Sequence, residues 1–402
     1  MSLSKNQNTK DQIVFLGEAR FPFGYAATQR MTLMARALLN AGIKATVICR
    51  KGSWNENHHQ NFSYKGNFEG IDYIYTSKNV HRPKGFIDRN LQKIIGIYGE
   101  FQYLKHLKRN DTISLAIVSN RKIIHVLRYY FFSRFLDFPI VINLVEMASA
   151  MPHKASITKK INYYLFDNWI LMLFDGAMPI SDRLMTFYHS KFPSKPAIKI
   201  PIICDFDKFN IAKDSTQEPY FLYCGSVDYV QVRNFVIEAY NAITNKRGYK
   251  LYMIISAENQ FRVNGLQQRL QKKYNTTNIK VFSNIPYQEL VNLYVNAKAL
   301  LIPLRNTLQD TSRFPHKIGE YLASGNPVIT TNIGEIQNYF QDGETALIAD
   351  TYDVSDFAGK MKYVLDYPEE SKDIGLNGKE LGLKEFDYKM HGSRLKNFLY
   401  EF

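Results

Sequence analysis

The stretch Arg313–Ile329 combines residue types that could bind a phosphorylated sugar. It predicts a loop, a short helix from Pro315 to about Gly325, and then a buried strand. A helix start carries unpaired N–H groups and partial positive charge, and Lys317 lies beside it, so a phosphate would suit this place. Glu320 follows about one turn later, roughly 5 Å along the axis, where its carboxylate could accept hydrogen bonds from a sugar diol. A plain capped helix with a solvent-exposed Lys317–Glu320 pair explains the spacing equally well.

Two residues of the first half also stand where a ligand could bind. The apolar run Ile13–Leu16 predicts a buried strand, and the loop after it ends at Gly24. Ligands bind at such loops in parallel sheets, although one glycine is a weaker signal than GxGxxG, which this sequence lacks. Glu146 directly follows the predicted strand Ile140–Val145. An acid at the carboxyl end of a strand could act in a cleft, and a structural, hydrogen-bonded glutamate is an equally good interpretation.

Apolar runs that alternate with amphipathic stretches predict the elements that position these residues. The first strand, a helix over residues 26–40 and the strand Lys44–Cys49 form a unit that implies a parallel sheet. A second series of strands begins after residue 219, at 220–224, 250–256, 280–283, 299–303, 327–331 and 346–349. We therefore predict an α/β fold with two Rossmann-type sheets. A helix near Leu91–Lys108 places these apolar residues on one side: Leu91, Ile94, Ile95, Tyr98, Phe101 and Leu104.

The length of the chain indicates two domains. At 402 residues it exceeds what one hydrophobic core usually supports. Residues 201–219 carry acids and prolines with little periodicity, and we place the linker there. The predicted domains are residues 1–204 and 205–384, and residues 385–402 are predicted to form a helix that packs back on the first domain.

The excess of positive charge belongs to the first half. Residues 1–200 contain 28 Lys and Arg against 13 Asp and Glu, whereas residues 201–402 contain 23 against 24. This suggests an anionic partner for the first domain, such as a membrane surface, a lipid phosphate or nucleic acid. Charge that only keeps the protein soluble is the alternative. The patch to test comprises Arg82, Lys84, Arg89, Lys93, Lys105, Lys108 and Arg109.

Other features of the sequence argue against several classes of protein. No apolar run is long enough to span a bilayer, and the polar segment Met1–Gln12 lacks a signal-peptide core, so we expect a cytoplasmic protein. Cys49, Cys204 and Cys224 lie in or beside apolar runs without CxxC spacing, which favours small buried residues over disulfides or metal ligands. The histidines show no metal-ligand spacing, and His316 alone adjoins the predicted phosphate site.

Several segments, taken in order along the chain, resemble GT-B glycosyltransferases, specifically the retaining glycosyltransferase family 4 (glycosyl transferases group 1). These are the glycine loop and first helix from Phe23–Arg30 onward, the interdomain segment Ile200–Phe209, the base-binding region Phe282–Leu290, the donor helix within Arg313–Ile329, and Asn332–Glu335 after it. The resemblance implies two Rossmann-like domains facing across a cleft, with a nucleotide-sugar held mainly by the second and the acceptor on the first. It also implies retained anomeric configuration and no requirement for a metal or other cofactor.

The resemblance also assigns roles to individual residues. Lys317 and Arg233 would stabilise the negative charge that develops on the diphosphate. Glu146 would lie near the reacting carbon, as the third catalytic residue, and Glu320 would bind the ribose. The implied donor-binding set is Gly24, Gly225, Ser226, Ile285, Ser312, Phe314, Pro315, His316 and Glu320.

The sequence departs from the family pattern at two places. The family has a pair of glutamates eight positions apart, which would fall on Ser312 and Glu320, so the member that touches the donor sugar is missing. Ser312 itself or the nearby Asp310 could substitute. The family also has Gly-Arg after the first strand of the second domain, where this chain has Gly225 followed by serine. Arg233 could stand in for the lysine that follows in the family, or it could be an exposed residue at a helix start.

Three functional hypotheses follow. The first is a glycosyltransferase of surface-polysaccharide or glycolipid biosynthesis, cytoplasmic or peripheral on the inner face of the membrane. Its partners would be a nucleotide-sugar, a saccharide or lipid-linked acceptor and an anionic membrane surface, without nucleic acid. The second is a GT-B nucleotide-sugar isomerase (epimerase), because the missing glutamate leaves the sugar side unusual. The third is a non-catalytic, polyanion-binding GT-B scaffold, which the uneven charge suggests.

Overall fold

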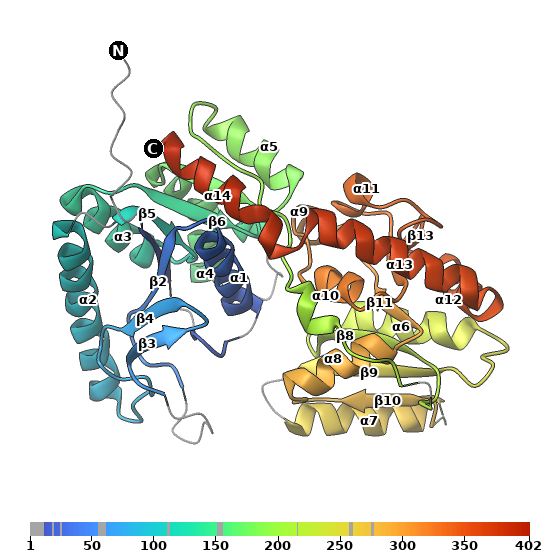
Figure 1. Cartoon of the computed structure of the whole chain (residues 1–402). Helices are drawn as coiled ribbons and strands as arrows, with labels where there is room; N and C mark the ends of the chain where they lie inside the picture. Colours follow the sequence, from blue (N-terminus) through green and yellow to red (C-terminus); the bar gives the residue numbers. More distant parts are fainter. Residues whose placement is uncertain are drawn as a thin grey trace, which may run out of the picture. The chain divides into compact units, whose positions relative to one another are not determined.

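The computed structural model describes residues 12–17, 20–24, 26–54, 62–110, 113–150, 156–214, 216–256, 260–274 and 277–402. The chain divides into two compact units, drawn from blue to red along the sequence in Figure 1. Unit 1 comprises residues 1–203 and 388–402, and unit 2 comprises residues 204–387. The predicted boundaries, after residues 204 and 384, lie close to these limits.

Unit 1 is built on a seven-stranded sheet in the order β3-β4-β2-β1-β5-β6-β7. Among the described strands, β3 alone runs antiparallel to its neighbour. The strand order reverses between β1 and β5, and ligands bind at the carboxyl ends of the strands at such a reversal. The strands are β1 (Gln12–Gly17), β2 (Lys44–Cys49), β3 (Lys65–Phe68), β4 (Ile71–Tyr75), β5 (Ile113–Val118), β6 (Ile140–Leu144) and β7 (Gly176–Pro179).

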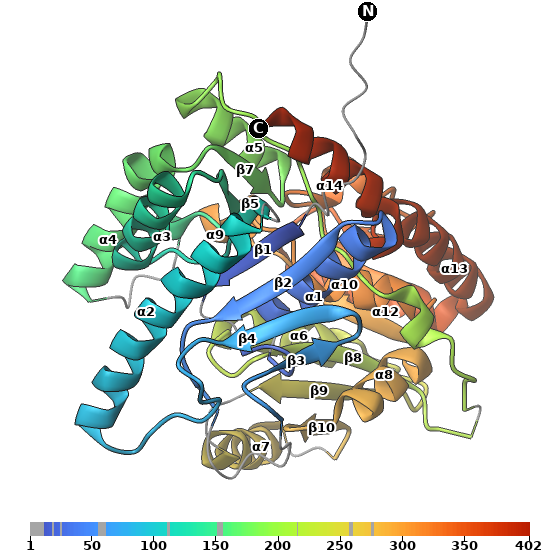
Figure 2. The same cartoon turned by 60° about the vertical axis from the view of Figure 1, so that its left-hand side comes forward.

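Helices cover both faces of this sheet (Figure 2). α2 packs beside α3, and α3 in turn contacts η2, which follows α4. The last helix, α14, returns to α1, where a β-carbon on Gly392 would lie 2.4 Å from the Ala37 carbonyl oxygen. The helices are α1 (Ala26–Asn40), α2 (Phe86–Arg109), α3 (Ile123–Leu136), α4 (Ile157–Asn168), α5 (Asp182–Lys191) and α14 (Gly392–Phe398), with short turns η1 (Ala148–Ala150), η2 (Ile170–Leu173), η4 (Tyr388–His391) and η5 (Leu399–Glu401).

α2 turns its polar side toward the sheet. Its buried positions include Gln92, Gly96 and Glu100, whereas Leu91 and Ile94 are exposed. The apolar residues that the sequence places on one side do lie there, but most of that side faces outward. In the first half of the helix this side is not covered by the core of unit 1, and Leu104 is the member that is fully buried.

Two glycines and an ion pair explain this orientation of α2. A β-carbon on Gly96 would lie 2.1 Å from the Arg50 carbonyl oxygen, and one on Gly99 would lie 2.5 Å from the Thr76 carbonyl oxygen. The helix therefore approaches these loops more closely than any larger residue would allow. One turn on, the buried Glu100 carboxylate lies 2.9 Å from the Arg128 guanidinium of α3. The close approach of the two glycines and the Glu100–Arg128 ion pair each require the polar side of α2 to face the sheet.

Unit 2 contains a six-stranded sheet in the order β10-β9-β8-β11-β12-β13, and all of its described strand pairs are parallel. The order reverses between β8 and β11, as it does between β1 and β5 in unit 1. The predicted series of strands is confirmed, with ends shifted by a few residues. The strands are β8 (Tyr220–Ser226), β9 (Lys250–Ser256), β10 (Ile279–Phe282), β11 (Ala299–Ile302), β12 (Val328–Thr331) and β13 (Leu347–Ala349).

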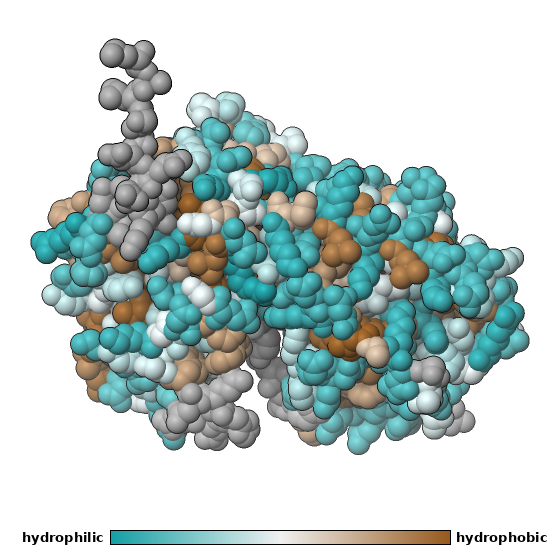
Figure 3. Space-filling model, in the orientation of Figure 1, coloured by the Kyte–Doolittle hydropathy of each residue, from teal (hydrophilic) through white to brown (hydrophobic). Residues whose placement is uncertain are grey.

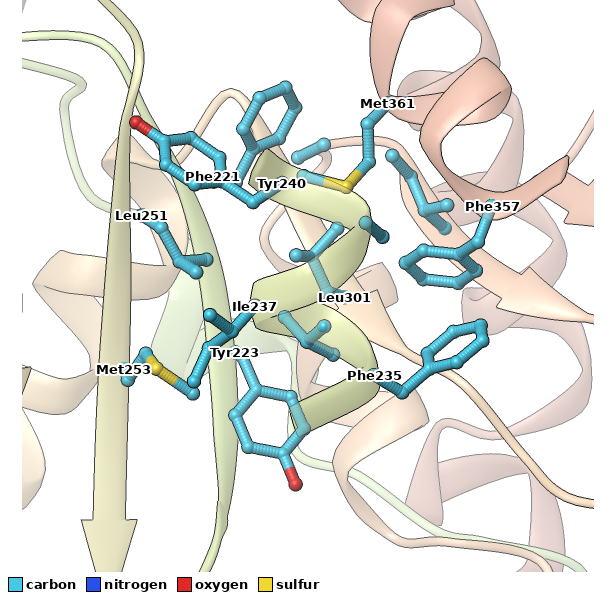
Figure 4. Close-up of a cluster of buried hydrophobic side chains, with 14 of the residues drawn as sticks. Phe221, Tyr223, Phe235, Ile237, Tyr240, Leu251, Met253, Leu301, Phe357 and Met361 are labelled. Atoms are coloured by element: carbon cyan, nitrogen blue, oxygen red, sulfur yellow. The ribbon is translucent and has the colours of Figure 1, made fainter. Parts of the chain in front are cut away.

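The core of unit 2 lies between this sheet and its helices. In Figure 4, α6 runs between the strands and α12, with Ile237 and Tyr240 toward Leu251 and Phe221, and Phe235 toward the opposite side, near Phe357. The helices are α6 (Val230–Ala242), α7 (Gln260–Tyr274), α8 (Tyr287–Asn296), α9 (Leu308–Ser312), α10 (Lys317–Ala323), α11 (Ile336–Tyr339), α12 (Val354–Asp366) and α13 (Pro368–Glu385), with the turn η3 (Phe206–Phe209).

Candidate functional site

The candidate residues of unit 2 gather at the carboxyl ends of β8 and β11, where the strand order reverses. β8 continues to Ser226, so the two residues assigned to a loop lie in the strand. A β-carbon on Gly225 would lie 2.3 Å from the Tyr223 hydroxyl oxygen, which explains the glycine. The Ser226 hydroxyl accepts a hydrogen bond from the backbone N–H of Asp228 (3.3 Å) and shapes the following turn. A reversal of this kind is the usual ligand site of a Rossmann-type sheet.

Glu320 is the acid at this edge of the sheet. Burial raises the pKa of its carboxyl from 4.5 to about 7, and Lys317, the Tyr294 hydroxyl and Lys208 oppose this rise, in that order. These three groups come from α10, α8 and η3. The carboxyl therefore holds its proton more strongly than an exposed glutamate, and a ligand that donates hydrogen bonds to it would favour the ionised form.

Lys317 is the cation closest to this acid in the sequence, and it acts on two groups. It favours ionisation of Glu320, and it also opposes the rise that burial causes in the pKa of the Cys224 thiol. Its ammonium group therefore lies near the end of β8. Tyr321, which is fully buried, fixes this arrangement because its hydroxyl accepts a hydrogen bond from the Cys224 N–H (3.1 Å). The predicted buried stripe of the helix is confirmed at Ile318, Tyr321 and Leu322.

The start of α10 differs from the prediction. The helix begins at Lys317, with His316 as its N-cap, rather than at Pro315. The N–H groups of Ile318 and Gly319 donate to the carbonyl oxygens of Pro315 (3.0 Å) and His316 (3.1 Å). These two N–H groups are already hydrogen-bonded within the turn, so fewer backbone N–H groups remain to bind a phosphate than the sequence suggested. The Lys317 side chain becomes the main candidate for that contact.

Phe314 lies in the core rather than at the site. Its side chain is 2% exposed, stacks on Tyr339 at a ring distance of 5.6 Å and meets Phe386 edge-on at 5.5 Å. Its predicted place in the donor-binding set could therefore involve only its backbone. Ile285, assigned to the same set, is half-buried in the loop between β10 and α8.

Ser312 and Asp310, the two candidates for the missing glutamate, both have structural partners. The buried Ser312 hydroxyl donates to the Leu308 carbonyl oxygen (2.6 Å), one turn back in α9. Asp310 is 1% exposed and lies between two guanidinium groups, 2.8 Å from Arg305 and 2.6 Å from Arg313. Each side chain thus stabilises the segment 305–313 itself.

The two arginines beside Asp310 were missed as site residues by the sequence analysis. Arg313 also donates to the Tyr229 hydroxyl (3.1 Å), and Arg305 donates to the Gln231 side-chain carbonyl (3.3 Å). They link the segment after β11 to the start of α6. The position of Arg305 three residues after β11 was the available signal, because ligand contacts cluster at carboxyl ends of strands.

Arg233 lies inside unit 2. It is 7% exposed, and its guanidinium donates to the Val227 carbonyl oxygen (3.1 Å) in the loop after β8. Burial lowers its pKa. The alternative of an exposed residue at a helix start is therefore wrong, and its predicted contact with a diphosphate stays a prediction.

In unit 1, Glu146 stands just past the carboxyl end of β6, close to where the sequence placed it. Its carboxylate lies 3.1 Å from the guanidinium of Arg121, which follows β5. Gly24 precedes α1, and a β-carbon there would lie 2.0 Å from the Thr28 hydroxyl oxygen. This close contact within unit 1 explains why position 24 is a glycine.

The described residues show two further features that bear on function. They contain no group of three His, Cys, Asp or Glu side chains that could hold a metal ion, and no helix among them is long and apolar enough to cross a membrane. None of the three cysteines, all of which lie in the described part of the chain, forms a disulfide; Cys49 and Cys204 are buried and Cys224 is half-buried, in line with the interpretation as small interior residues.

Comparison with known proteins identifies the family. Residues 205–381, nearly all of unit 2, match the family described as Glycosyl transferases group 1. Unit 2 is therefore a group 1 glycosyltransferase domain. This confirms the family that the ordered motifs predicted, and it favours neither an isomerase nor a non-catalytic scaffold. A comparison with curated proteins found no match.

Solved structures establish the fold of this glycosyltransferase as GT-B. Sucrose-phosphate synthase from Thermosynechococcus elongatus is similar over 97% of this chain and 98% of its own, with a TM-score of 0.75 and 14% identity. HepE from Anabaena in complex with UDP and glucose has a TM-score of 0.69 and 12% identity over 97% and 99%. The UDP-forming α,α-trehalose-phosphate synthase from Burkholderia xenovorans in complex with glucose-6-phosphate has a TM-score of 0.65 and 12% identity over 97% and 100%.

Proposed function

We propose that this glycosyltransferase moves a sugar from a nucleotide-sugar, bound by unit 2, to an acceptor hydroxyl with retention of anomeric configuration. The observation that carries the proposal is the Glu320–Lys317 pair at the strand reversal of unit 2. A carboxyl with a pKa of about 7 beside a lysine offers an acceptor for a ribose diol and a cation for the adjoining phosphates.

The chemistry of donor cleavage gives the lysine its role. When the sugar–phosphate bond breaks, negative charge develops on the departing diphosphate, and groups that bind this charge most strongly in the transition state accelerate the step. Lys317 is the group best placed to bind this developing charge. Arg233, whose guanidinium donates to the Val227 carbonyl oxygen in the loop after β8, would add positive charge on the inner side of that loop. The proposal needs no metal, so the activity should persist in a chelator such as EDTA.

We assign the acceptor to unit 1, with Glu146 near the reacting carbon. The complexes of HepE with UDP and glucose and of trehalose-phosphate synthase with glucose-6-phosphate support a uridine donor as the first to test and a saccharide as the acceptor. The basic first half supports an acceptor at an anionic membrane surface, in surface-polysaccharide or glycolipid assembly. The enzyme would then be cytoplasmic and peripheral on the inner face of the membrane.

A thermal-shift screen against nucleoside diphosphates and their sugars tests the donor site. A ligand that binds the folded state must raise the melting temperature by mass action. We expect a rise with at least one member, and its loss in Glu320→Ala. No rise with any member would contradict the proposal.

The stereochemistry of the product tests the reaction. Proton NMR of the product should show the anomeric configuration of the donor sugar, and product should form only when an acceptor is present. An altered free nucleotide-sugar formed without acceptor would instead support the isomerase hypothesis.

A further inference from the structure

Three neighbouring helices of unit 1 expose an extended set of apolar side chains, which we call the apolar face. Brown patches along the left-hand edge of Figure 3 overlie α2. Scattered exposed apolar residues are normal, whereas a gathered set marks an interaction surface. The face comprises Phe86, Ile87, Leu91, Ile94, Ile95 and Tyr98 on α2, Ile124, Phe131 and Phe135 on α3, and Ile157, Ile161, Tyr164 and Leu165 on α4.

The parts of the apolar face on α2 and α3 are joined. The ring of Phe101 lies 5.1 Å from that of Phe132 and 5.7 Å from that of Phe135, so aromatic contacts bridge the two helices. The close approach of Gly96 to the loop at Arg50 keeps the polar side of α2 inward. Unit 1 itself therefore cannot cover the apolar side of this helix, and another apolar phase must do so if it is to be buried.

A cavity of about 610 Å³ opens at the amino-terminal half of α2. Its walls are the loop after β2, the segment at Arg82 and the first turns of the helix. Among the described lining residues there is no acid, and six are cationic: Arg20, Arg50, Lys51, Arg82, Arg89 and Lys93. The predicted basic patch is thus divided, because Lys105, Lys108 and Arg109 lie at the other end of the helix.

The cations of the cavity act on one another. Burial, together with the charges of Arg50, Lys93, Lys122 and Arg82, lowers the pKa of Lys51 to about 8. The nearby Glu100 carboxylate is already paired with Arg128. A bound anion would reduce the electrostatic repulsion among these cations. A phosphate, which carries more than one negative charge, suits a site made of several lysines and arginines.

The cavity and the apolar face meet on α2. Phe86 lines the cavity and is exposed at the start of the apolar face. Further along the helix, Arg89 and Lys93 lie on the cavity side, whereas Ile87, Leu91 and Ile94 lie on the outward side. A ligand that satisfies both features carries a phosphate and a hydrocarbon chain together. A soluble phosphorylated saccharide would account for the cavity alone, and an apolar protein partner would account for the face alone.

We propose that unit 1 binds an anionic membrane lipid, with the lipid phosphate in the cavity and the acyl chains against the apolar face. This inference rests on the proposed function, in which unit 1 takes its acceptor at a membrane, and it names the lipid phosphate as the group recognised. The aromatic residues Tyr98 and Tyr164 are of the type that favours the boundary between headgroups and acyl chains.

Vesicle sedimentation of the full-length protein tests both parts. The vesicles are phosphatidylcholine alone, or phosphatidylcholine mixed with phosphatidic acid. The cavity pair Arg82→Ala/Lys93→Ala is compared with Lys44→Ala/Lys65→Ala, which removes the same charge from exposed strand positions outside the cavity. The face pair Ile94→Ser/Tyr98→Ser is compared with Met390→Ser/Tyr400→Ser, which removes exposed apolar groups outside the apolar face.

We expect the wild type to bind phosphatidic acid vesicles at least about tenfold more tightly than neutral ones, and the cavity pair to lose about tenfold. The face pair should bind the phosphatidic acid vesicles more weakly by a similar factor. This loss should persist at high salt, since salt screens charge but does not weaken apolar burial. Both control pairs should change binding by less than about threefold.

Three results would overturn the inference: equal losses in the cavity and control pairs, unchanged binding of the face pair, or tight binding of inorganic pyrophosphate without any preference for phosphatidic acid vesicles. The last result would indicate a soluble phosphate ligand. The nucleoside-diphosphate thermal shift is measured on every variant. Its absence counts against the proposed donor site, whereas its presence with failed vesicle binding counts against the lipid site alone.

Discussion

The two units share one strand order but use it differently. Both sheets reverse order at the centre, between β1 and β5 in unit 1 and between β8 and β11 in unit 2. Unit 2 surrounds its reversal with an acid, a lysine and ion-paired arginines. Unit 1 carries a cationic cavity and exposes the apolar side of α2. The scaffold thus determines where a ligand can bind, and the loops and outer helices determine which ligand it is.

The largest expected effect is on the donor side of this comparison. Glu320→Ala removes the carboxylate proposed to hold the ribose, and kcat/KM should fall about a hundredfold or more. Binding to phosphatidic acid vesicles should not change, because that contact is assigned to unit 1. Steady-state kinetics and sedimentation of the same preparation check both statements. A variant that keeps its activity would show that the acid is structural.

The next effect concerns the segment 305–313. Asp310→Ala leaves Arg305 and Arg313 without their shared carboxylate and should lower the free energy of unfolding by about 3 kcal/mol. If Asp310 is structural, KM for the donor should change little at a temperature where the variant stays folded. Unchanged stability with a large rise in KM would instead assign it to sugar recognition.

The orientation of α2 can be tested with matched glycines. Gly96→Ala must displace the Arg50 carbonyl oxygen and should destabilise the protein by about 2 kcal/mol. Gly359→Ala, on α12 of unit 2, meets nothing within 4 Å and should stabilise by about 0.5–1 kcal/mol through helix propensity. Denaturant unfolding measures both changes, and equal values would contradict the close approach of α2 to its loop.

The smallest effect is a pH dependence of stability in unit 2. Folding raises the pKa of Glu320 from 4.5 to about 7, so its contribution to stability is present below pH 4.5 and is lost as pH rises through about 7. Glutamine at position 320 stays neutral at every pH. Relative to the wild type, the free energy of unfolding of Glu320→Gln should therefore rise by on the order of 1–2 kcal/mol when the pH is raised from 5 to 8. Melting curves at the two pH values check this, and a constant difference would contradict the raised pKa.

The sequence predicted the strands of unit 2 and the buried stripe of α10, because period and turn residues are local signals. It also placed Glu146 just after a parallel strand and Lys317 at the start of a helix. These successes depend on patterns that a short segment carries by itself.

The sequence could not predict features that depend on contacts between distant segments. The sequence placed the apolar row of α2 on one side of a helix without showing which way that side faces, and the fit of Gly96 against the loop at Arg50 turns it outward. The pairing of Asp310 with Arg305 and Arg313 likewise depends on how a short loop and helix fold back. The surroundings of Glu320 bring together Lys208 and Tyr294, which are about 110 and 26 positions away in the chain.

The central claim is that Lys317 holds the donor phosphate and Glu320 the ribose. Calorimetric titration with the nucleoside diphosphate identified by thermal shift, and with the corresponding nucleoside, tests it most directly. Lys317→Ala should weaken the binding of the diphosphate at least about tenfold, since a lost charge-assisted contact costs about 1.5–3 kcal/mol. It should leave the binding of the nucleoside unchanged. Glu320→Ala should weaken both ligands by similar factors. Equal losses for both ligands in Lys317→Ala, or unchanged nucleoside binding in Glu320→Ala, would contradict the account.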